Sequence, residues 1–171
     1  MNEYRENLLY AQIGEKLIGE EEIFEHIRDN EIRIRYLESN KPAGKSKRVI
    51  LGECRKFSDR NRQILEACNI RKEDIPDFVI VIYKERIHGF TNEQLRILIM
   101  HELMHIGVKE DSETGVVSYH IVKHDLEDFR TIIEQFGTDW AADKTQITWQ
   151  QVMEAASERT VDEETGEIIE G

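Results

Sequence analysis

Apolar residues recur at helical spacing through the first thirty residues of the chain. The stripe consists of Leu8, Leu9, Ile13, Leu17, Ile18, Ile23, Phe24 and Ile27. This period predicts a helix from Glu3 to about Asn30. Gly14 and Gly19 fall within it and favour a division into two helices, because glycine costs roughly 1 kcal/mol in a helix interior.

The next segments have the patterns of strands. Residues 32–37 alternate with a period of two, which indicates a half-buried strand. A turn at 41–46 separates it from a second strand, Val49 to Phe57, and we expect these two strands to pair as a hairpin. A short helix is expected around Asp59 to Cys68. The apolar, β-branched run from Phe78 to Tyr83 predicts a buried strand.

Residues 91–107 predict a mostly buried helix that carries polar side chains. Thr91 followed by Gln94 fits a capping box at the helix start. An apolar run then leads to the pentad His101-Glu102-Leu103-Met104-His105, and Gly107 is the expected helix stop. Burying two histidines and a glutamate without partners costs several kcal/mol, which a metal ion would offset. A core helix with hydrogen-bonded histidines is the alternative.

The pentad suits metal-assisted hydrolysis, most often of a peptide bond. His101 and His105 are four residues apart and share one helix face, so both can bind one Zn²⁺. Glu102 can reach a zinc-bound water, accept its proton and pass it to a leaving amine. A catalytic zinc needs a third protein ligand, and the downstream candidates are His124, His120 and Asp111.

The chain also resembles a known family, the phage metallopeptidases, which are related to the SprT-like zinc proteases. The resemblance covers roughly residues 30–140. Its motifs are the pentad, then His124-Asp125 with Phe129, then Phe136-Gly137 and Trp140, after the strand 77–82. It implies zinc held by His101, His105 and His124, with Glu102 as general base. On this ground we rank His124 before His120 and Asp111.

Further polar residues are candidates for a supporting role. A zinc-bound histidine usually donates its second ring N–H to a carboxylate or carbonyl. Asp125 and Asp128 are nearby carboxylates, although acids at a helix start are also favoured by the helix dipole. Tyr119 is a candidate oxyanion donor or, more simply, a packing residue.

Composition limits the domain organisation and the cellular location that we expect for the protein. The chain has 171 residues, 39% of them hydrophobic, which suits one compact domain with a tail. It has no apolar run of about eighteen residues, and its N-terminus lacks the form of a signal peptide. Two cysteines, Cys54 and Cys68, imply no disulfide framework. We expect a cytoplasmic protein, in the host cytoplasm if phage-encoded, with no membrane partner.

Charge is unevenly distributed along the chain. The net charge is −12, yet residues 31–72 hold twelve Lys and Arg against five Asp and Glu. Such a stretch can mark a nucleic-acid surface, but the overall negative charge opposes binding to phosphate. Residues 157–167 are acidic and predict a flexible tail.

The sequence therefore predicts an α+β, zincin-like fold. A small antiparallel or mixed sheet packs against the pentad helix, with further helices at both ends. We expect an N-terminal helical segment (1–30), a metallopeptidase domain (31–145), and a C-terminal helix capped by Thr148 with an acidic tail (146–171). The predicted function is zinc-dependent hydrolysis of a protein or peptide substrate. The alternatives are a non-catalytic zincin-like binding or inhibitor protein and a protease that acts on DNA-bound proteins.

Overall fold

A computed structural model describes residues 3–41, 50–124, 129–137, 140–141, 160–161 and 168–169. The chain forms two compact units, Met1–Ala141 and Ala142–Gly171. In the second unit, β7 (Thr160–Val161) and β8 (Ile168–Ile169) pair antiparallel. The helix expected after Thr148 and most of the acidic tail lie outside the described residues.

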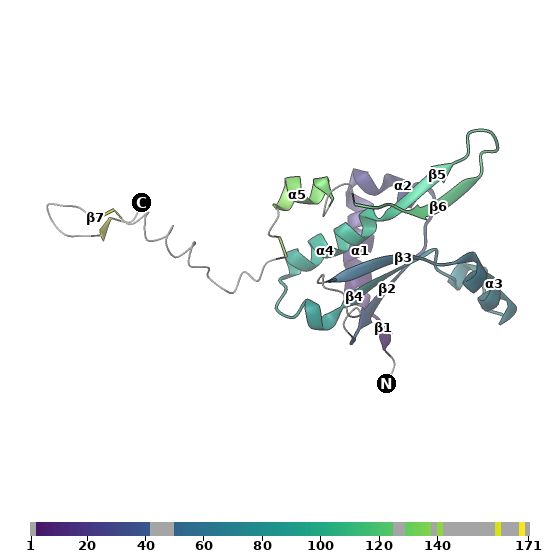
Figure 1. The fold of residues 1–171 in the computed structure, drawn as a ribbon, viewed down its shortest axis with the longest axis horizontal. Coiled ribbons are helices and arrows are strands. Elements are labelled where there is room, and N and C mark those ends of the chain that lie inside the picture. Colours follow the sequence, from purple (N-terminus) through teal and green to yellow (C-terminus); the bar gives the residue numbers. More distant parts are fainter. Residues whose placement is uncertain are drawn as a thin grey trace. The chain divides into compact units, whose positions relative to one another are not determined.

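The first unit is built on a four-stranded mixed sheet with the order β1-β2-β4-β3 (Figure 1). Its strands are β1 (Tyr4–Glu6), β2 (Ile34–Ser39), β3 (Gly52–Lys56) and β4 (Phe78–Tyr83). β4 is parallel to β2 and antiparallel to β3, and β1 is antiparallel to β2.

The expected hairpin between the first two predicted strands is wrong, because β4 lies between β2 and β3. β4 is apolar at all six positions, and five of them are buried. β4 has no charged residue, whereas β2 contains Arg35 and Glu38 and β3 contains Glu53, Arg55 and Lys56. A wholly apolar strand gains most from an interior position, so β4 has a neighbour on each side and the charged β3 takes the edge of the sheet. The predicted bounds of β4 itself are confirmed.

The N-terminal segment contains a strand and two helices. β1 precedes α1 (Leu8–Glu20), which begins where the Asn7 side chain accepts from the N–H groups of Leu9 and Tyr10. A 3-10 turn, η1 (Glu22–Phe24), and the short helix α2 (Glu25–Asp29) follow. The predicted helix is therefore divided, but at Glu21, and both glycines lie inside α1.

The core lies where α1 and α4 (Asn92–Met104) pack on one face of the sheet, as Figure 1 shows. Eight of the thirteen residues of α4 are buried. The buried cluster includes Tyr10 and Leu17 from α1, Ile80 and Ile82 from β4, and Leu98, Ile99 and Leu103 from α4. The pentad helix is thus a central element of the core.

The remaining elements surround this core. They are α3 (Asp59–Ala67), η2 (Lys72–Asp74), η3 (Lys84–Arg86), the hairpin of β5 (Ile106–Glu110) and β6 (Val117–Ile121), and α5 (Arg130–Phe136). The predicted short helix is confirmed as α3, which Ser58 caps. The predicted helix stop is wrong, because α4 ends at Met104 and Gly107 lies within β5.

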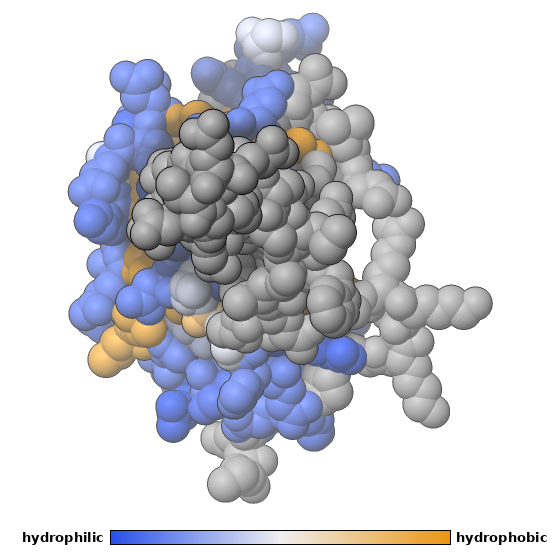
Figure 2. Space-filling view, turned by 90° about the vertical axis from the view of Figure 1, so that its left-hand side faces the viewer, coloured by the Kyte–Doolittle hydropathy of each residue, from blue (hydrophilic) through white to orange (hydrophobic). Residues whose placement is uncertain are grey.

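The fold confirms the predicted α+β class. None of the helices in the described part of the chain is long and apolar enough to cross a membrane. On the face seen in Figure 2, the coloured hydrophobic residues form small, separate patches among hydrophilic ones.

Candidate metal centre

Three of the predicted site residues come together at one end of α4. His101 and His105 belong to the last turn of the helix and its C-cap, and His124 lies shortly after β6. The His124 Nε2 atom is 3.1 Å from His101 Nε2 and 3.0 Å from His105 Nε2. One ligand atom from each histidine lies within 4.8 Å of the other two. Their nitrogens therefore converge on one point.

Two structural features bring these histidines together: the capped helix α4 and the β5–β6 hairpin that follows it. The capping box of Thr91 and Gln94 is present and fixes the start of α4, so the four-residue spacing places His101 and His105 on one face. The β5–β6 hairpin then returns the chain to the end of the helix. The Val122 N–H donates to the His105 carbonyl at 2.8 Å, which places His124 beside the other two histidines.

The ring of His105 is oriented by a backbone carbonyl. Its Nδ1 lies 2.7 Å from the Val122 oxygen, which has no proton to donate, so Nδ1 is the donor. A neutral imidazole carries one N–H, and the Nε2 atom of His105 therefore directs a lone pair toward the cluster. This is the tautomer that a metal ligand requires.

Three converging imidazole nitrogens fit a metal ion better than a hydrogen-bond network. Two ligands about 2.0–2.1 Å from a tetrahedral zinc are about 3.3 Å apart, close to the separations between these Nε2 atoms. His101 and His105 are half-buried and His124 is exposed, so the cluster faces solvent on one side.

Glu102 lies between the two helical histidines in sequence and is almost completely buried, with 3% of its surface exposed. Its carboxylate lies against the backbone of β3 at Gly52. The half-buried Cys54 lies two residues further along this strand, and burial and the negative charge of Glu102 raise the pKa of its thiol.

An aromatic side chain packs against all three histidines. The ring centroid of Phe129 is 5.3 Å from that of His101, 4.9 Å from that of His105 and 5.0 Å from that of His124. Phe129 is buried and lies at the start of α5, so this helix presents an apolar wall to the cluster. The wall shields one side of the imidazoles from water.

A second aromatic residue is held to the start of α4. The Trp140 ring lies 6.3 Å from the His101 ring, and the Trp140 carbonyl accepts a hydrogen bond from Gln94 Nε2 at 3.2 Å. The capping residue Gln94 thus also fixes the segment that carries Trp140.

The other predicted site residues lie elsewhere or outside the described residues. His120 is on β6 and packs across Gly107 of β5. Asp111 accepts hydrogen bonds from Glu113 and Thr114 in the hairpin turn. The Tyr119 hydroxyl donates to the Asn30 carbonyl at 3.3 Å. Asp125 and Asp128 fall in the segment that the structure does not describe.

Sequence reasoning missed two contributors to the site. The Val122 carbonyl could not have been found, because every residue has one and only the hairpin register selects it. Gly52 had a signal, since a glycine at the start of a strand often marks a close approach of another group.

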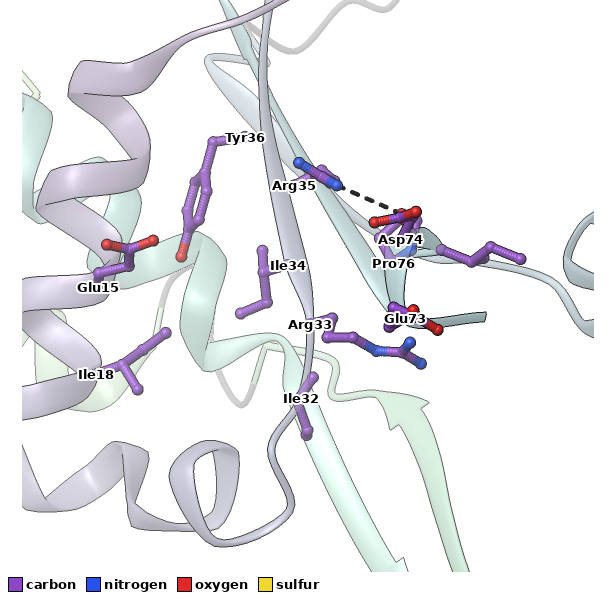
Figure 3. A pocket seen from close by; sticks show the side chains of 11 residues that line it. Glu15, Ile18, Ile32, Arg33, Ile34, Arg35, Tyr36, Glu73, Asp74 and Pro76 are labelled. Carbon is purple, nitrogen blue, oxygen red and sulfur yellow. Dashed lines mark hydrogen bonds between the residues drawn. The ribbon is translucent and has the colours of Figure 1, made fainter. Parts of the chain in front are cut away.

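A cavity of about 300 Å³ lies beside the N-terminal half of β2 (Figure 3). The Tyr36 ring fills the space between β2 and α1, and its hydroxyl points toward Glu15. On the other side of β2, Arg35 donates to the Asp74 carbonyl at 3.4 Å. No histidine of the cluster lines this cavity, so it is separate from the candidate metal centre.

The described part of the basic stretch is largely paired with acids. Arg33 and Arg62 bind Asp77, and further ion pairs join Arg35 to Glu6, Lys41 to Glu3, Arg55 to Glu53, and Arg71 to Glu73 and Asp74. These pairs reduce the positive field that a nucleic acid would meet. Binding to nucleic acid was an alternative that the sequence left open and did not favour, and it stays untested.

The α+β fold and the histidine cluster beside a buried glutamate have the features of a metal-dependent hydrolase. The sequence profile of the family described as putative phage metallopeptidase matches residues 2–157. Because the match spans more than half of the chain, the protein belongs to this family. The family implies a metal ion and a protein or peptide substrate. No curated protein and no solved structure matches the chain.

Proposed function

We propose that this protein is a zinc-dependent metallopeptidase with a zincin-like arrangement. His101, His105 and His124 hold the ion, and Glu102 is the general base. The observation that carries the proposal is the convergence of three histidine nitrogens, of which the His124 Nε2 lies 3.0–3.1 Å from both others. The family supports a metal-dependent peptidase in general.

The residues present match the needs of peptide hydrolysis. A bound zinc ion lowers the pKa of a coordinated water to about 7 and polarises a peptide carbonyl. Glu102 follows His101 directly on α4, where its carboxylate can accept the proton of the attacking water and later give it to the leaving amine. Phe129 excludes water from one side of the histidines, and the exposed side at His124 admits the substrate.

Zinc is the metal that this set of ligands suits best. Three imidazole nitrogens with one open position are typical of catalytic zinc, in which the fourth position is left for water or substrate. Copper, nickel and iron also bind imidazole, and a measurement of metal identity decides among them.

The test is elemental analysis of the purified protein together with three variants. We expect one zinc per chain in the wild type, in Glu102→Gln and in His120→Ala, and no bound zinc in His124→Ala. The His120 variant is the matched control, because it also removes an exposed histidine near the hairpin but not from the cluster.

Hydrolysis of fluorescein-labelled casein then tests the mechanism. Glu102→Gln keeps the metal and loses hydrolysis, because its amide cannot accept the proton. If this variant cleaves casein at the wild-type rate, Glu102 is not the base. A wild type that binds one zinc but cleaves neither casein nor other unfolded proteins would instead support the alternative, a non-catalytic zincin-like binding protein.

A further inference from the structure

The first residue of β3 touches the side chain that we assign as the general base. A methyl group built on Gly52 would lie 2.9 Å from Glu102 Oε1 and 3.2 Å from its Cδ. It would also lie 2.9 Å from the Cδ1 atom of Ile82, the residue opposite Gly52 in the sheet. The backbone of β3 therefore forms one wall of the space that holds the Glu102 carboxylate.

Backbone conformation does not require a glycine at this position. Among the described residues, the glycines with positive φ are Gly89, Gly115 and Gly137, so Gly52 has a backbone that alanine adopts without strain. What the position requires is the absence of a side chain. The contacts with Glu102 explain this requirement.

We propose that Gly52 is a positioning residue for the reaction: its missing side chain lets β3 approach α4 closely and sets the location of the Glu102 carboxylate. The proposal rests on the proposed function, because Gly52 affects the reaction only by positioning Glu102, the proposed general base. Glu102 is 3% exposed, so neighbouring atoms surround its carboxylate. Any displacement of the carboxylate therefore also changes its orientation.

The contact geometry gives the size of the effect. Ordinary van der Waals contact begins at 3.4 Å, whereas the added methyl would lie 2.9 Å from Oε1. The group that must yield is the end of a flexible side chain, so the fold survives and the carboxylate moves by about half an ångström. Since a misplacement of about 1 Å can lower a rate a hundredfold, we expect Gly52→Ala to lower kcat about tenfold.

The experiment compares Gly52→Ala with Gly19→Ala as a matched control. Gly19 lies on α1 with nothing within 4 Å of an added methyl, so this variant makes the same substitution without a new contact. We expect both variants to fold and to bind one zinc with wild-type affinity. Gly19→Ala should melt at or slightly above the wild-type Tm, because alanine restricts the unfolded chain, whereas Gly52→Ala should melt slightly below it, because two buried side-chain ends must shift. In casein hydrolysis, only Gly52→Ala has a lower kcat, and its KM is unchanged.

A binding measurement tests the same contact without a substrate. Acetohydroxamate chelates divalent metals through its two oxygens and can donate a hydrogen bond to a neighbouring carboxylate. We expect the Co²⁺-loaded Gly52→Ala variant to bind it about tenfold more weakly than the wild type, because one charge-assisted hydrogen bond is misaligned. Binding to Gly19→Ala should equal that to the wild type.

Two double variants show whether the effect passes through Glu102. In a Glu102→Asp background the carboxylate is withdrawn by one methylene, so the methyl at position 52 no longer meets it. The added Gly52→Ala change should then alter acetohydroxamate affinity by less than about twofold, which is the limit of ordinary additivity. Ile82→Val removes the other contact, and Gly52→Ala in that background should keep its full effect.

The outcomes separate this proposal from the proposed function. A wild type that binds no metal would remove the proposed function, whatever Gly52 does. A wild type that binds metal and acetohydroxamate, with a Gly52→Ala variant of equal kcat and affinity, would overturn the positioning role alone. An equal loss in the Glu102→Asp background, or rescue by Ile82→Val, would overturn it too. An unfolded Gly52→Ala variant would overturn the positioning role as well, because the added methyl would then disrupt the fold and not merely displace the Glu102 carboxylate.

Discussion

A buried carboxylate ties β2, β4 and α3 together. Asp77, immediately before β4, is 5% exposed and accepts four hydrogen bonds. Its Oδ2 atom accepts from the backbone N–H of Arg33 at 2.9 Å and from Nε of Arg33 at 3.0 Å. Its Oδ1 atom accepts from Nη2 of Arg33 at 3.1 Å and from Nη2 of Arg62 at 2.8 Å. We expect Asp77→Asn to destabilise the fold strongly.

The size of this effect follows from the burial of the three side chains. Removing one partner of a buried ion pair costs about 3–5 kcal/mol, because the other charge is left uncompensated. The Arg33 side chain is 35% exposed, so water screens part of its charge, and the asparagine oxygen still accepts some of the bonds. We therefore expect a loss of about 3 kcal/mol, which lowers Tm by about 6–12 °C in a protein of this size.

Urea unfolding at neutral pH measures the loss, and Asp74→Asn is the matched control. Asp74 makes a similar bond to Arg71 at 2.8 Å, but the two side chains are 43% and 70% exposed. An exposed pair of this kind contributes about 0–1 kcal/mol, so the control should change stability little. If the two variants are destabilised equally, burial is not what gives the Asp77 contacts their strength and the reasoning is refuted.

The effect of Asp77 also has a predictable dependence on pH. Burial by itself would raise the pKa of the Asp77 carboxyl, but the hydrogen bonds from Arg33 and Arg62 bring it below its ordinary value of 3.8. Because the folded value is lower than the unfolded one, the stabilisation is complete above pH 3.8 and is lost as the pH falls through the folded value. The difference between the wild type and Asp77→Asn should therefore shrink only below this pH.

Three further predictions concern packing, thiol reactivity and the metal centre. Gly14→Ala should destabilise the fold by about 1–3 kcal/mol, because the new methyl would lie 2.1–2.6 Å from the Tyr36 ring and hydroxyl; unchanged urea unfolding would contradict this. The exposed Cys68 should react with a disulfide reagent well before Cys54, whose thiol pKa is raised by burial, and equal rates would be inconsistent with that burial. Phe129→Ala should weaken zinc binding about tenfold in a chelator competition, because the imidazoles lose their apolar support; unchanged affinity in a folded variant would show that the wall has no such role.

Local signals in the sequence were sufficient for the pentad helix. Its capping box is confirmed, as is the placement of both pentad histidines at the end of one buried helix. The strand from Phe78 to Tyr83 was also predicted correctly, because a short apolar run rich in β-branched residues is typical of a buried strand. These features depend on residues close together in the chain.

Pairing and short elements depended on distant contacts and could not be predicted. The three-residue strand β1 lies within a helical pattern, and its pairing with β2 overrides that local preference. The order of β2, β3 and β4 depends on which strand gains most from burial on both faces. Neither is encoded in a short window of sequence.

The third histidine shows how a distant contact can set a site. His124 follows His105 by nineteen residues, so no periodicity connects them. The β5–β6 register pairs Ile106 with Ile121, which places Val122 opposite His105 and brings His124 to the cluster. Two residues inserted in the hairpin turn between Thr114 and Gly115 leave this register intact, and zinc binding should persist. One alanine inserted after Val122 displaces His124 along the strand direction by about 3.3 Å, more than a zinc–nitrogen bond, and binding should be lost. Equal zinc content in the two insertion variants would show that the hairpin register does not set the site.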